Sequence, residues 1–520
     1  MPDFLLTALV FIAWMAFATK RLMTYLHILQ QDDYDNARLM RWIFEYRVFD
    51  KRLSAMLLII GFLSFFIPHL LTALLLVLAF GWTAYNEKDP RQSTSKKKLV
   101  MTQRARRIFF FALALAVILG LWSFVIPLPL LWILSVQMVP AALFLANILL
   151  IPVEKSIQKK FWNEAHAKLL TCNPKIIGIT GSFGKTSVKH ILGHILKTQA
   201  PTLITPGSVN TPMGITRIIR EQLEDNHKYF IVEMGAYGPG SIARLCDLVP
   251  PDMGIITAIG HAHYERFKTL ETVAQAKFEL AEAVLKKNGK IIVHEAVLEQ
   301  PYAAQIKTEN LQNFITCGED ALHTEQTEKG LRVKVIYEDA SYTIEAPLYG
   351  LHHGGNIALA FVAAINLGIP AENIITALKS TPQITHRLEV KPQADGRIFI
   401  DDAFNSNPKG FRAALELLDF LGKNRRKILI TPGMVELGEA HATQHQEIGK
   451  IAGEICDVVI AVNPGRIRNF TNAIKNSGAQ LIEVARFTEA AEWLEKNKKP
   501  GDVILIENDL PDLYERIPKI

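Results

Sequence analysis

Five apolar stretches lie within the first 151 residues and constrain this chain more than any other feature. They contain no Asp, Glu, Lys or Arg, and they cover residues 4–18, 54–67, 69–85, 108–126 and 129–151. A helix needs about 20 apolar residues to cross the core of a bilayer. The sequence therefore predicts an N-terminal α-helical transmembrane region over residues 1–153, with about five short transmembrane segments.

Basic residues between the stretches indicate how this region is oriented. Segments 20–52 and 87–107 carry seven and eight Lys or Arg residues, and such an excess marks cytoplasmic loops. The prediction is a multi-pass protein of the inner (cytoplasmic) membrane, with the lipid bilayer as a partner and the rest of the chain on the cytoplasmic side. Two alternatives stay open. Residues 4–18 could be a signal peptide, although they lack a basic n-region and a small-residue cleavage site, and residues 54–85 could be a re-entrant or interfacial segment instead of a hairpin broken at Pro68.

Composition disfavours several classes of function. The formal charge is only +6, and no stretch interleaves basic with aromatic residues, so nucleic acid is not an expected partner. Ion pathways usually need charged residues inside the membrane, and the apolar stretches contain none, so a transporter has little support. The four cysteines are widely spaced and indicate neither a disulfide framework nor a metal site.

The remainder of the chain alternates short β-branched runs with amphipathic segments, a pattern typical of parallel sheets flanked by helices. We expect two α/β domains, a central P-loop ATPase domain over residues 165–385 and a C-terminal Rossmann-like domain over residues 386–520. A helix is predicted over 270–287, a β-rich stretch lies around 313–347, and a helical region follows near 355–380. The runs that predict buried strands are 175–179, 229–234, 253–257, 290–294, 397–403, 427–432, 457–462, 479–484 and 502–508.

The segment IIGITGSFGKTSVKH, residues 176–190, predicts a strand, a turn and a helix that together bind phosphate. Gly181 and Gly184 allow backbone N–H groups to converge on phosphate oxygens, and the helix N-terminus adds partial positive charge. Lys185 would reach the outer phosphates, and Thr186 would hold Mg²⁺. A purely structural turn explains Gly-Lys-Thr-Ser after an apolar strand poorly, so ATP and Mg²⁺ are the expected cofactors.

Three further residues are candidates on their own chemistry. Glu233 ends an apolar strand, and α/β sheets bind ligands at the carboxyl ends of their strands, so Glu233 is a candidate Mg²⁺ ligand or else a solvated strand end. His263 belongs to an H-A-H triplet, which alone more often marks a surface. Lys277 lies on an apolar helical face, where a lysine usually extends outward to water. His445 falls on a predicted helix and is expected to be exposed to solvent.

A series of short segments in the second half of the chain has a recognisable order. The segments are TGSFGKTS (180–187), TPGSVNTPMG (205–214), IVEMGAYGPGSI (231–242), ITAIGHAHYERF (256–267), AQAKFEL (274–280), GLHHGGNIALA (350–360), HRLEV (386–390), DDAFNSNPKGF (401–411) and TPGMVELGE (431–439). This series resembles the Mur ligases, the ATP-dependent enzymes that add amino acids to the peptidoglycan precursor. The resemblance covers roughly residues 170–450, and the last two segments are similar to the branch that adds D-alanyl-D-alanine.

The resemblance implies roles for individual residues. The residues implied to bind ATP are Gly181, Ser182, Gly184, Lys185, Thr186, Ser187, Asn210, Asn356, Arg387 and Asp402. The implied metal ligands are Thr186, Glu233, His263 and Lys277, the last in carbamylated form. The implied catalytic residues are Lys185, His263, Lys277 and Arg387. For Arg387 and Asp402 the plain alternative is an ordinary surface or strand-end residue.

The implied reaction is ATP-dependent amide formation. ATP converts a carboxylate into an acyl phosphate, and the amine of an amino acid or dipeptide then displaces phosphate, so that ADP and phosphate are released. The carboxylate acceptor would be a muramyl peptide or a lipid-linked molecule, and the amine donor would be D-Ala-D-Ala. The alternatives are a similar ligase acting on another polymer, such as polyglutamate, and an ATP-driven transporter, for which an L-S-G-G-Q-like signature is missing.

The chain departs from the family pattern in three places. The apolar region stands where the family has a domain that binds uridine diphosphate. His353 stands where the family has an asparagine. The segment IENDLPDLYERI, residues 506–517, is acidic where this branch has a K-G-S-R-like loop. These departures leave amide ligation in place and leave the identity of both substrates open.

Overall fold

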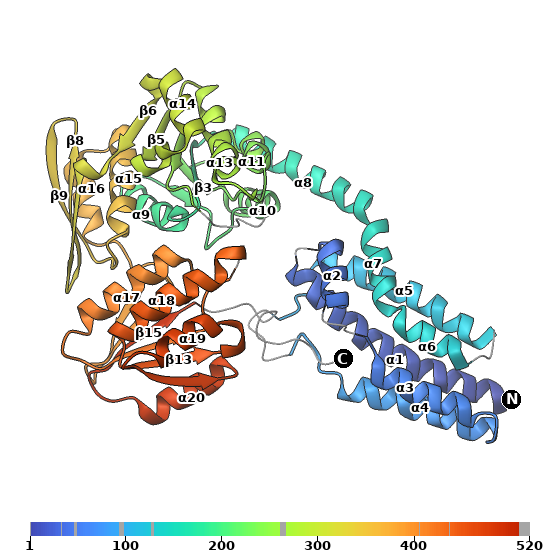
Figure 1. Ribbon diagram of the computed structural model, residues 1–520. Helices are drawn as coiled ribbons and strands as arrows, with labels where there is room; N and C mark the ends of the chain where they lie inside the picture. Colours follow the sequence, from blue (N-terminus) through green and yellow to red (C-terminus); the bar gives the residue numbers. More distant parts are fainter. Residues whose placement is uncertain are drawn as a thin grey trace. The chain divides into compact units, whose positions relative to one another are not determined.

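The computed structural model divides the chain into two compact units, residues 1–158 and residues 159–509, and each is described by itself. Figure 1 colours both units along the sequence. The structure describes residues 2–32, 34–45, 49–92, 98–125, 129–260, 267–404, 406–435 and 437–508.

The first unit is a bundle of helices. Helix α1 packs against α4 and α5, and α3 packs against α4 and α6. Its core contains Trp14, Phe17 and Phe80, whereas large apolar side chains such as Phe62 and Trp122 are exposed on its outside. The helices are α1 (Pro2–Gln31), α2 (Asn36–Glu45), α3 (Lys51–Leu63), α4 (His69–Asn86), α5 (Gln103–Val125), α6 (Pro129–Gln137), α7 (Val139–Leu149) and α8 (Ile151–Cys172), which continues into the second unit.

Three helical stretches of this bundle are long and apolar enough to cross a membrane, judged by length and composition alone: Phe4–Gln31, His69–Asn86 and Gln103–Trp122. A fourth span is possible if the pair α6 and α7, bent by 50° at its break, counts as one. Five segments were expected. The difference lies at 54–67, because the helix there, α3, has only 13 residues, or about 20 Å of length against a bilayer core of about 30 Å.

A buried ionic cluster within the bundle was not anticipated from the sequence. Arg21 lies on α1 beyond the apolar run, and its guanidinium is 2.6 Å from the Asp50 carboxylate and 3.0 Å from that of Glu87. Arg21 and Asp50 are each 3% exposed. Buried charges are costly unless they are paired, so this cluster fixes the end of α1 against the segments that precede α3 and follow α4.

The second unit begins with a parallel sheet of six strands in the order β2-β3-β1-β4-β5-β6. Apolar cores cover both faces of this sheet, one under α9 and α15 and the other under α10, α11 and α13. The strands are β1 (Lys175–Thr180), β2 (Thr202–Ile204), β3 (Tyr229–Glu233), β4 (Met253–Ile256), β5 (Lys290–His294) and β6 (Phe314–Cys317). The helices are α9 (Lys185–Lys197), α10 (Pro212–Gln222), α11 (Ser241–Leu248), α13 (Leu270–Leu285), α14 (Pro301–Glu309), α15 (His353–Asn366) and α16 (Ala371–Leu378).

Strand β1 lies at the point where the strand order reverses, because β3 pairs with it on one side and β4 on the other. Ligands of open α/β sheets bind at such switch points. Inside β1, Gly178 permits a close approach of helix α13: a Cβ atom built on it would lie 2.7 Å from Leu280. The loop after β1 is therefore placed where a nucleotide would bind.

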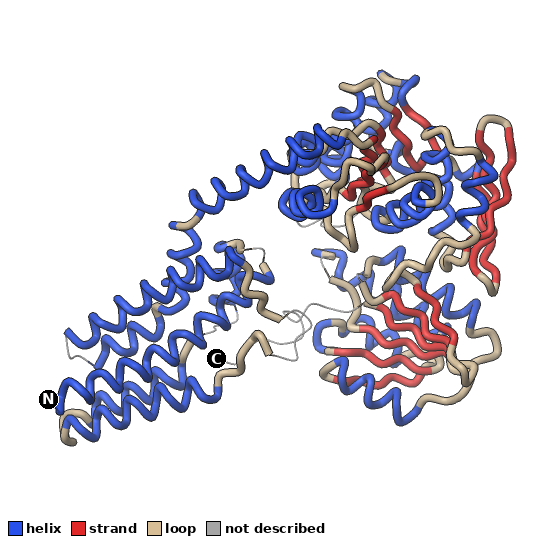
Figure 2. The backbone as a smooth tube through the Cα atoms, turned by 180° about the vertical axis from the view of Figure 1, so that it is seen from behind, coloured by secondary structure: helices blue, strands red, loops and turns tan. Residues whose placement is uncertain are grey.

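Three antiparallel strands follow, namely β7 (Leu322–Thr327), β8 (Gly330–Tyr337) and β9 (Ala340–Ala346). Figure 2 shows them in red as a separate small sheet. Their buried residues, among them Val333 and Ile344, share a core with Phe361 of α15. The small sheet thus covers the side of α15 that faces away from the parallel strands.

A second six-stranded sheet occupies the end of the described chain, in the order β10-β11-β15-β12-β13-β14. All its pairs are parallel except β10 with β11. The strands are β10 (Glu389–Pro392), β11 (Ile398–Asp402), β12 (Lys427–Thr431), β13 (Val458–Val462), β14 (Gln480–Val484) and β15 (Val503–Glu507). The helices are α17 (Pro408–Leu421), α18 (His441–Ile455), α19 (Arg468–Lys475) and α20 (Phe487–Asn497).

The prediction that His445 is exposed is wrong. The residue lies on α18 as expected but is fully buried, and its Nε2 accepts a hydrogen bond of 3.0 Å from the Met434 backbone N–H. Its Nδ1 donates to the His441 carbonyl at 2.8 Å. Burial lowers the pKa of His445 to about 4, so the ring stays neutral and holds the loop after β12.

Candidate active site

The loop between β1 and α9 is shaped by its glycines. Gly181 and Gly184 have φ angles of +151° and +81°, which few other residues adopt. A Cβ atom on Gly184 would also lie 2.6 Å from the Asn356 side-chain oxygen. Lys185, the first residue of α9, donates from Nζ to the Gly181 carbonyl at 2.7 Å. The loop therefore bends its backbone around the lysine at a helix N-terminus, the arrangement that binds phosphates.

Glu233, at the carboxyl end of β3, is the centre of a buried hydrogen-bond network. Its Oε2 accepts from the Thr186 hydroxyl at 3.0 Å, and its Oε1 accepts from the Asn210 amide at 3.1 Å. Its backbone N–H donates to the Thr205 hydroxyl at 3.1 Å. Three residues predicted from the sequence, namely Thr186, Asn210 and Glu233, are thus brought together beside the loop.

Lys189 belongs to this network and was missed in the sequence analysis. It lies one turn after Lys185 on α9, is 2% exposed, and its Nζ is 2.9 Å from Glu233 Oε2. It also donates to the Gly207 carbonyl. The signal available in the sequence was the spacing of four residues between two lysines at the start of one helix, which places both on the same face.

Ser182 and Ser187 are both buried, and Ser182 connects the loop to another segment. Ser182 is buried, donates to the Gly260 carbonyl at 3.0 Å and accepts from the Gly260 N–H at 2.9 Å. These two bonds tie the phosphate loop to the segment after β4. Ser187 is buried on α9.

Lys277, on α13, is buried instead of extending to solvent. It is 5% exposed, and no ion pair of its ammonium group with the described carboxylates is found. Burial, and then the nearby charge of Lys185, lower the pKa of Lys277 well below its ordinary value. The close contact of α13 with Gly178 brings this lysine toward the loop. A neutral amine is the form that reacts with carbon dioxide, so the environment suits carbamylation.

Asn356 lies on α15 against Gly184, where it can meet a nucleotide. Its amide is 3.2 Å from His353 Nδ1, and His353 is 1% exposed. Burial and the neighbouring His352 and Arg387 lower the pKa of His353 well below its usual value. The histidine that replaces the family's asparagine is therefore a neutral, buried partner of Asn356.

Arg387 is held in a linker of unusual backbone conformation. The residues on either side, His386 and Leu388, have φ angles of +58° and +49°, which cost energy in residues that carry a side chain. The Arg387 guanidinium stacks on the Phe404 ring at 4.2 Å. Burial lowers the pKa of Lys185, and the charge of Arg387 lowers it further, so Arg387 interacts electrostatically with the phosphate loop.

Two consecutive aspartates at the end of β11 anchor that linker. Asp401 Oδ2 is 3.0 Å from His386 Nδ1, and Asp402 Oδ1 accepts from the Leu388 N–H at 3.2 Å. His386, Glu389 and Asp401 could together hold a metal ion, but Lys391 already lies 2.9 and 2.8 Å from the two carboxylates. Asp402, predicted to bind ATP, thus also holds the backbone beside Arg387.

His263, predicted as a metal ligand and catalytic residue, lies outside the described residues. The oxygen ligands that remain, from Thr186 and Glu233, are the kind that Mg²⁺ prefers, and Lys185 beside them suits a triphosphate. These residues therefore fit ATP and Mg²⁺, with Lys189 as a resident positive charge on the same carboxylate.

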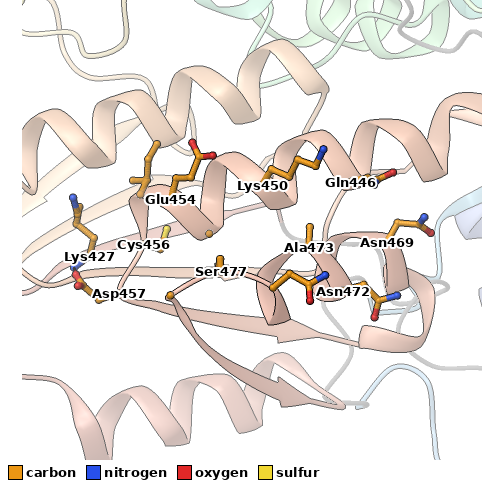
Figure 3. A pocket seen from close by; sticks show the side chains of 14 residues that line it. Lys427, Gln446, Lys450, Glu454, Cys456, Asp457, Asn469, Asn472, Ala473 and Ser477 are labelled. Carbon is orange, nitrogen blue, oxygen red and sulfur yellow. Dashed lines mark hydrogen bonds between the residues drawn. The ribbon is translucent and has the colours of Figure 1, made fainter.

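A hollow of about 870 Å³ lies elsewhere, between α18 and α19 (Figure 3). Gln446 and Lys450 line it from one helix and Asn469 from the other. It reaches Lys427, the first residue of β12. The residues that line this hollow include none of the predicted site residues.

The fold and the loop geometry define a nucleotide-binding α/β enzyme with a phosphate-loop domain followed by a second α/β domain. Comparison with known families agrees: residues 179–364 match the Mur ligase middle domain, and residues 386–507 match the Mur ligase glutamate ligase domain.

Two curated relatives illustrate the similarity. The UDP-N-acetylmuramoyl-tripeptide–D-alanyl-D-alanine ligase of Buchnera aphidicola subsp. Acyrthosiphon pisum is 32% identical over 341 residues, which cover 62% of this chain and 72% of that protein. The ligase of the same name from Bacillus subtilis is 29% identical over 370 residues, 68% of this chain and 77% of that protein.

Solved structures agree. MurF from Acinetobacter baumannii matches with a TM-score of 0.60 and 25% identity, over 69% of this chain and 78% of that one. MurF from Thermotoga maritima, in complex with ADP, matches with a TM-score of 0.58 and 24% identity, over 68% of this chain and 81% of that one. The chain belongs to the Mur ligase family of ADP-forming ligases, which confirms the resemblance seen in the sequence.

Proposed function

We propose that this protein is a membrane-anchored ligase that joins a carboxylate of a peptidoglycan precursor to the amine of D-Ala-D-Ala or a similar dipeptide. The observation that carries the proposal is the phosphate loop, in which Lys185 and the Thr186–Glu233 pair converge at the switch point of the sheet. The names of the curated relatives support the substrate class.

The loop residues bind and orient ATP in this proposal. Backbone N–H groups between Gly181 and Lys185 and the Lys185 ammonium surround the outer phosphates. Thr186 and Glu233 hold Mg²⁺, which when bound neutralises charge on the phosphate oxygens. Asn210 and Asn356 approach the nucleotide from either side of the loop, and Arg387 adds its charge from the linker.

The chemistry then proceeds in two balanced steps. An oxygen of the substrate carboxylate attacks the γ-phosphorus, the bond from that phosphorus to ADP breaks, and an acyl phosphate forms. The amine attacks the acyl carbon, the C–N bond forms and phosphate leaves with the C–O bond electrons, while the nitrogen loses its extra protons to the surrounding base groups. A carbamylated Lys277 would supply a carboxylate-like group near the acyl phosphate, since its buried amine is kept neutral.

Anchoring in the inner (cytoplasmic) membrane is the second part of the proposal. The candidate spans of the helical unit support it, as do the exposed apolar side chains such as Phe62 and Trp122 and the basic segments 20–52 and 87–107. These basic segments support a cytoplasmic location for the ligase domains. An acceptor that is itself lipid-linked would be within reach of such an anchored enzyme.

The test is ADP release by the full chain, purified in detergent from the membrane fraction. We expect release to depend on a muramyl tripeptide acceptor together with D-Ala-D-Ala, and to be lost in Lys185→Ala but kept in Lys197→Ala, an exposed lysine of the same helix. Turnover with glutamate instead would favour another polymer. Full turnover in Lys185→Ala would refute the loop assignment, and a chain found in the soluble fraction without detergent would refute the anchoring.

A further inference from the structure

Glu507 ends strand β15 in the region where the sequence is acidic instead of basic. It is 0% exposed. In the parallel pairing of β11 with β15, its Cα lies opposite that of Asp402. Two carboxyl groups therefore stand side by side at the carboxyl edge of the second sheet, out of contact with water.

The hydrogen bonds around Glu507 account for only one of its oxygens. The Ser406 hydroxyl donates to Oε1 at 2.6 Å, and no donor among the described residues faces the buried Oε2. The Asp402 carboxyl group lies beside Glu507 in the strand register and, after burial, raises its pKa. Two carboxyl groups can share a hydrogen bond only if one of them carries a proton, and Oε2 is the oxygen left to carry it.

The charges around the pair favour the same arrangement. Burial, followed by the Asp402 charge, raises the pKa of Glu507 well above its ordinary value, and Arg387 opposes this only in part. Burial raises the pKa of Asp402 to about 6, against the pull of Arg387, while Asp401 pushes it further up. Leu505, on the same face of β15 as Glu507, belongs to an apolar core with Leu429 of β12 and Leu415 of α17. The pair thus holds one proton near neutral pH and behaves as a unit.

Asp402 passes this arrangement on to the linker. Its Oδ1 accepts from the Leu388 N–H, directly after Arg387, while Asp401 holds His386 directly before it. Both flanking residues have left-handed backbones, which require such support. Asp402 thus supports the backbone directly after Arg387.

We propose that Glu507 is a positioning residue: it keeps its proton, donates it in a hydrogen bond to Asp402, and so fixes Arg387 for the nucleotide. The role toward nucleotide rests on the proposed function. The hydrogen bond itself does not, and it can be tested without turnover.

The experiment compares the wild-type full chain in detergent with Glu507→Gln, Glu507→Leu and, as a matched surface change, Glu495→Gln. Glutamine donates the same hydrogen bond at every pH, whereas leucine fills the space without donating. Glu495 has 67% of its side chain exposed. Two quantities are measured. The first is the thermal unfolding midpoint between pH 5 and pH 9, a range that lies above the ordinary Glu pKa of about 4.3. The second is the affinity for MgADP, by calorimetry.

A raised pKa makes the sign definite. The folded state retains a proton that the unfolded state has released, so the wild-type chain loses stability as pH rises toward the folded pKa of the pair. We expect Glu507→Gln to remove this loss, so that its midpoint rises relative to wild type with pH, and to bind MgADP as the wild type does. Glu507→Leu should weaken MgADP binding about tenfold, the usual effect of losing one hydrogen bond to a charged group. Glu495→Gln should change neither readout.

Two results would overturn the inference. One is a Glu507→Gln chain whose unfolding midpoint follows pH as the wild type does, since Glu507 then carries no proton to lose. The other is a folded Glu507→Leu chain that binds MgADP with wild-type affinity, since Arg387 then needs no such support. If Lys185→Ala retained turnover, the proposed function would fail, whereas the pH comparison of Glu507→Gln with wild type would still decide whether the carboxyl pair shares a proton.

Discussion

Strands β3 and β15 end in the same local pattern, four apolar residues and a glutamate, as YFIVE (229–233) and VILIE (503–507). Both glutamates are almost completely buried, at 1% and 0% exposure. Glu233 faces the Lys189 ammonium, whereas Glu507 faces a second carboxyl group. The same strand ending is thus stabilised by a resident cation in one domain and by a shared proton in the other, and only the first arrangement leaves a charged carboxylate suited to a metal.

The largest expected effect comes from removing the cation. Lys189→Met would leave Glu233 buried without its partner, which costs about 3–5 kcal/mol. Urea unfolding of the detergent-solubilised chain measures this loss, and Lys197→Met, an exposed lysine of the same helix, serves as the control. Adding Glu233→Gln to Lys189→Met should recover part of the loss. If Lys189→Met were as stable as the control Lys197→Met, the Lys189–Glu233 ion pair would not be needed to stabilise the buried Glu233.

A smaller effect is expected from acid, and in the C-terminal domain it should depend on His445. His445 is kept neutral by burial, which lowers its pKa to about 4. Because the unfolded chain takes up a proton at a higher pH than the folded chain, the stability is fully present at pH values above the ordinary histidine pKa. It is lost as pH falls from there toward 4. His445→Gln, which keeps an acceptor for the Met434 N–H, should lessen this loss by roughly 3 kcal/mol.

The free energy of unfolding of wild type and His445→Gln is compared at several pH values between the ordinary histidine pKa and the pKa of His445 in the folded protein. His323→Gln, at an exposed position on β7, should unfold with the pH dependence of the wild type. Acid sensitivity that is unchanged in His445→Gln would show that the loop after β12 does not depend on a neutral ring.

The smallest effect is expected where a charge pair is exposed. Arg486 and Glu489 are 2.8 Å apart, but their side chains are 52% and 34% exposed. Arg486→Gln should therefore cost less than about 1 kcal/mol. The difference should disappear in about 0.5 M salt, whereas that of Lys189→Met should persist because buried pairs are poorly screened. A salt-insensitive cost at Arg486 would contradict this distinction between exposed and buried pairs.

Much of the fold could be predicted because its signals are local. Continuous β-branched runs such as KIIGI and KILIT are buried on both faces, and they became β1 and β12 with ends within one or two residues of the expectation. The phosphate loop was predictable for the same reason, since its glycines and lysine are neighbours in the sequence.

The rest depends on partners that are distant along the chain. Lys189 is buried because Gly207 and Glu233 come from other segments, and its own helix pattern contains no sign of them. His445 is buried because the loop after β12 turns back onto α18. Glu507 ends a strand and precedes an acidic stretch, so its sequence neighbours suggest contact with water. The structure shows instead that it is buried and paired with Asp402 of β11.

The expectation of five membrane segments differs for another reason from the three, or up to four, described helices that are long enough to cross a bilayer. Apolar content was counted along the sequence, whereas a span requires an unbroken helix. The turn at Ser64–Pro68 ends α3 after 13 residues, which leaves the run before Pro68 too short. Composition therefore indicates apolar runs, but it does not give the number of described helices long enough to cross a bilayer.

The close packing of Gly178 against Leu280 has a consequence for substitutions at residue 178 and for the position of Lys277. Lys277 precedes Leu280 by almost one helical turn, so its distance from the phosphate loop is set by how near α13 can come to β1. A single methyl group on residue 178 would lie 2.7 Å from the end of the Leu280 side chain, so either that side chain would have to turn aside or the helix would have to move away. A substitution at residue 178 that moved the helix would therefore also move Lys277, without any direct contact between the two residues.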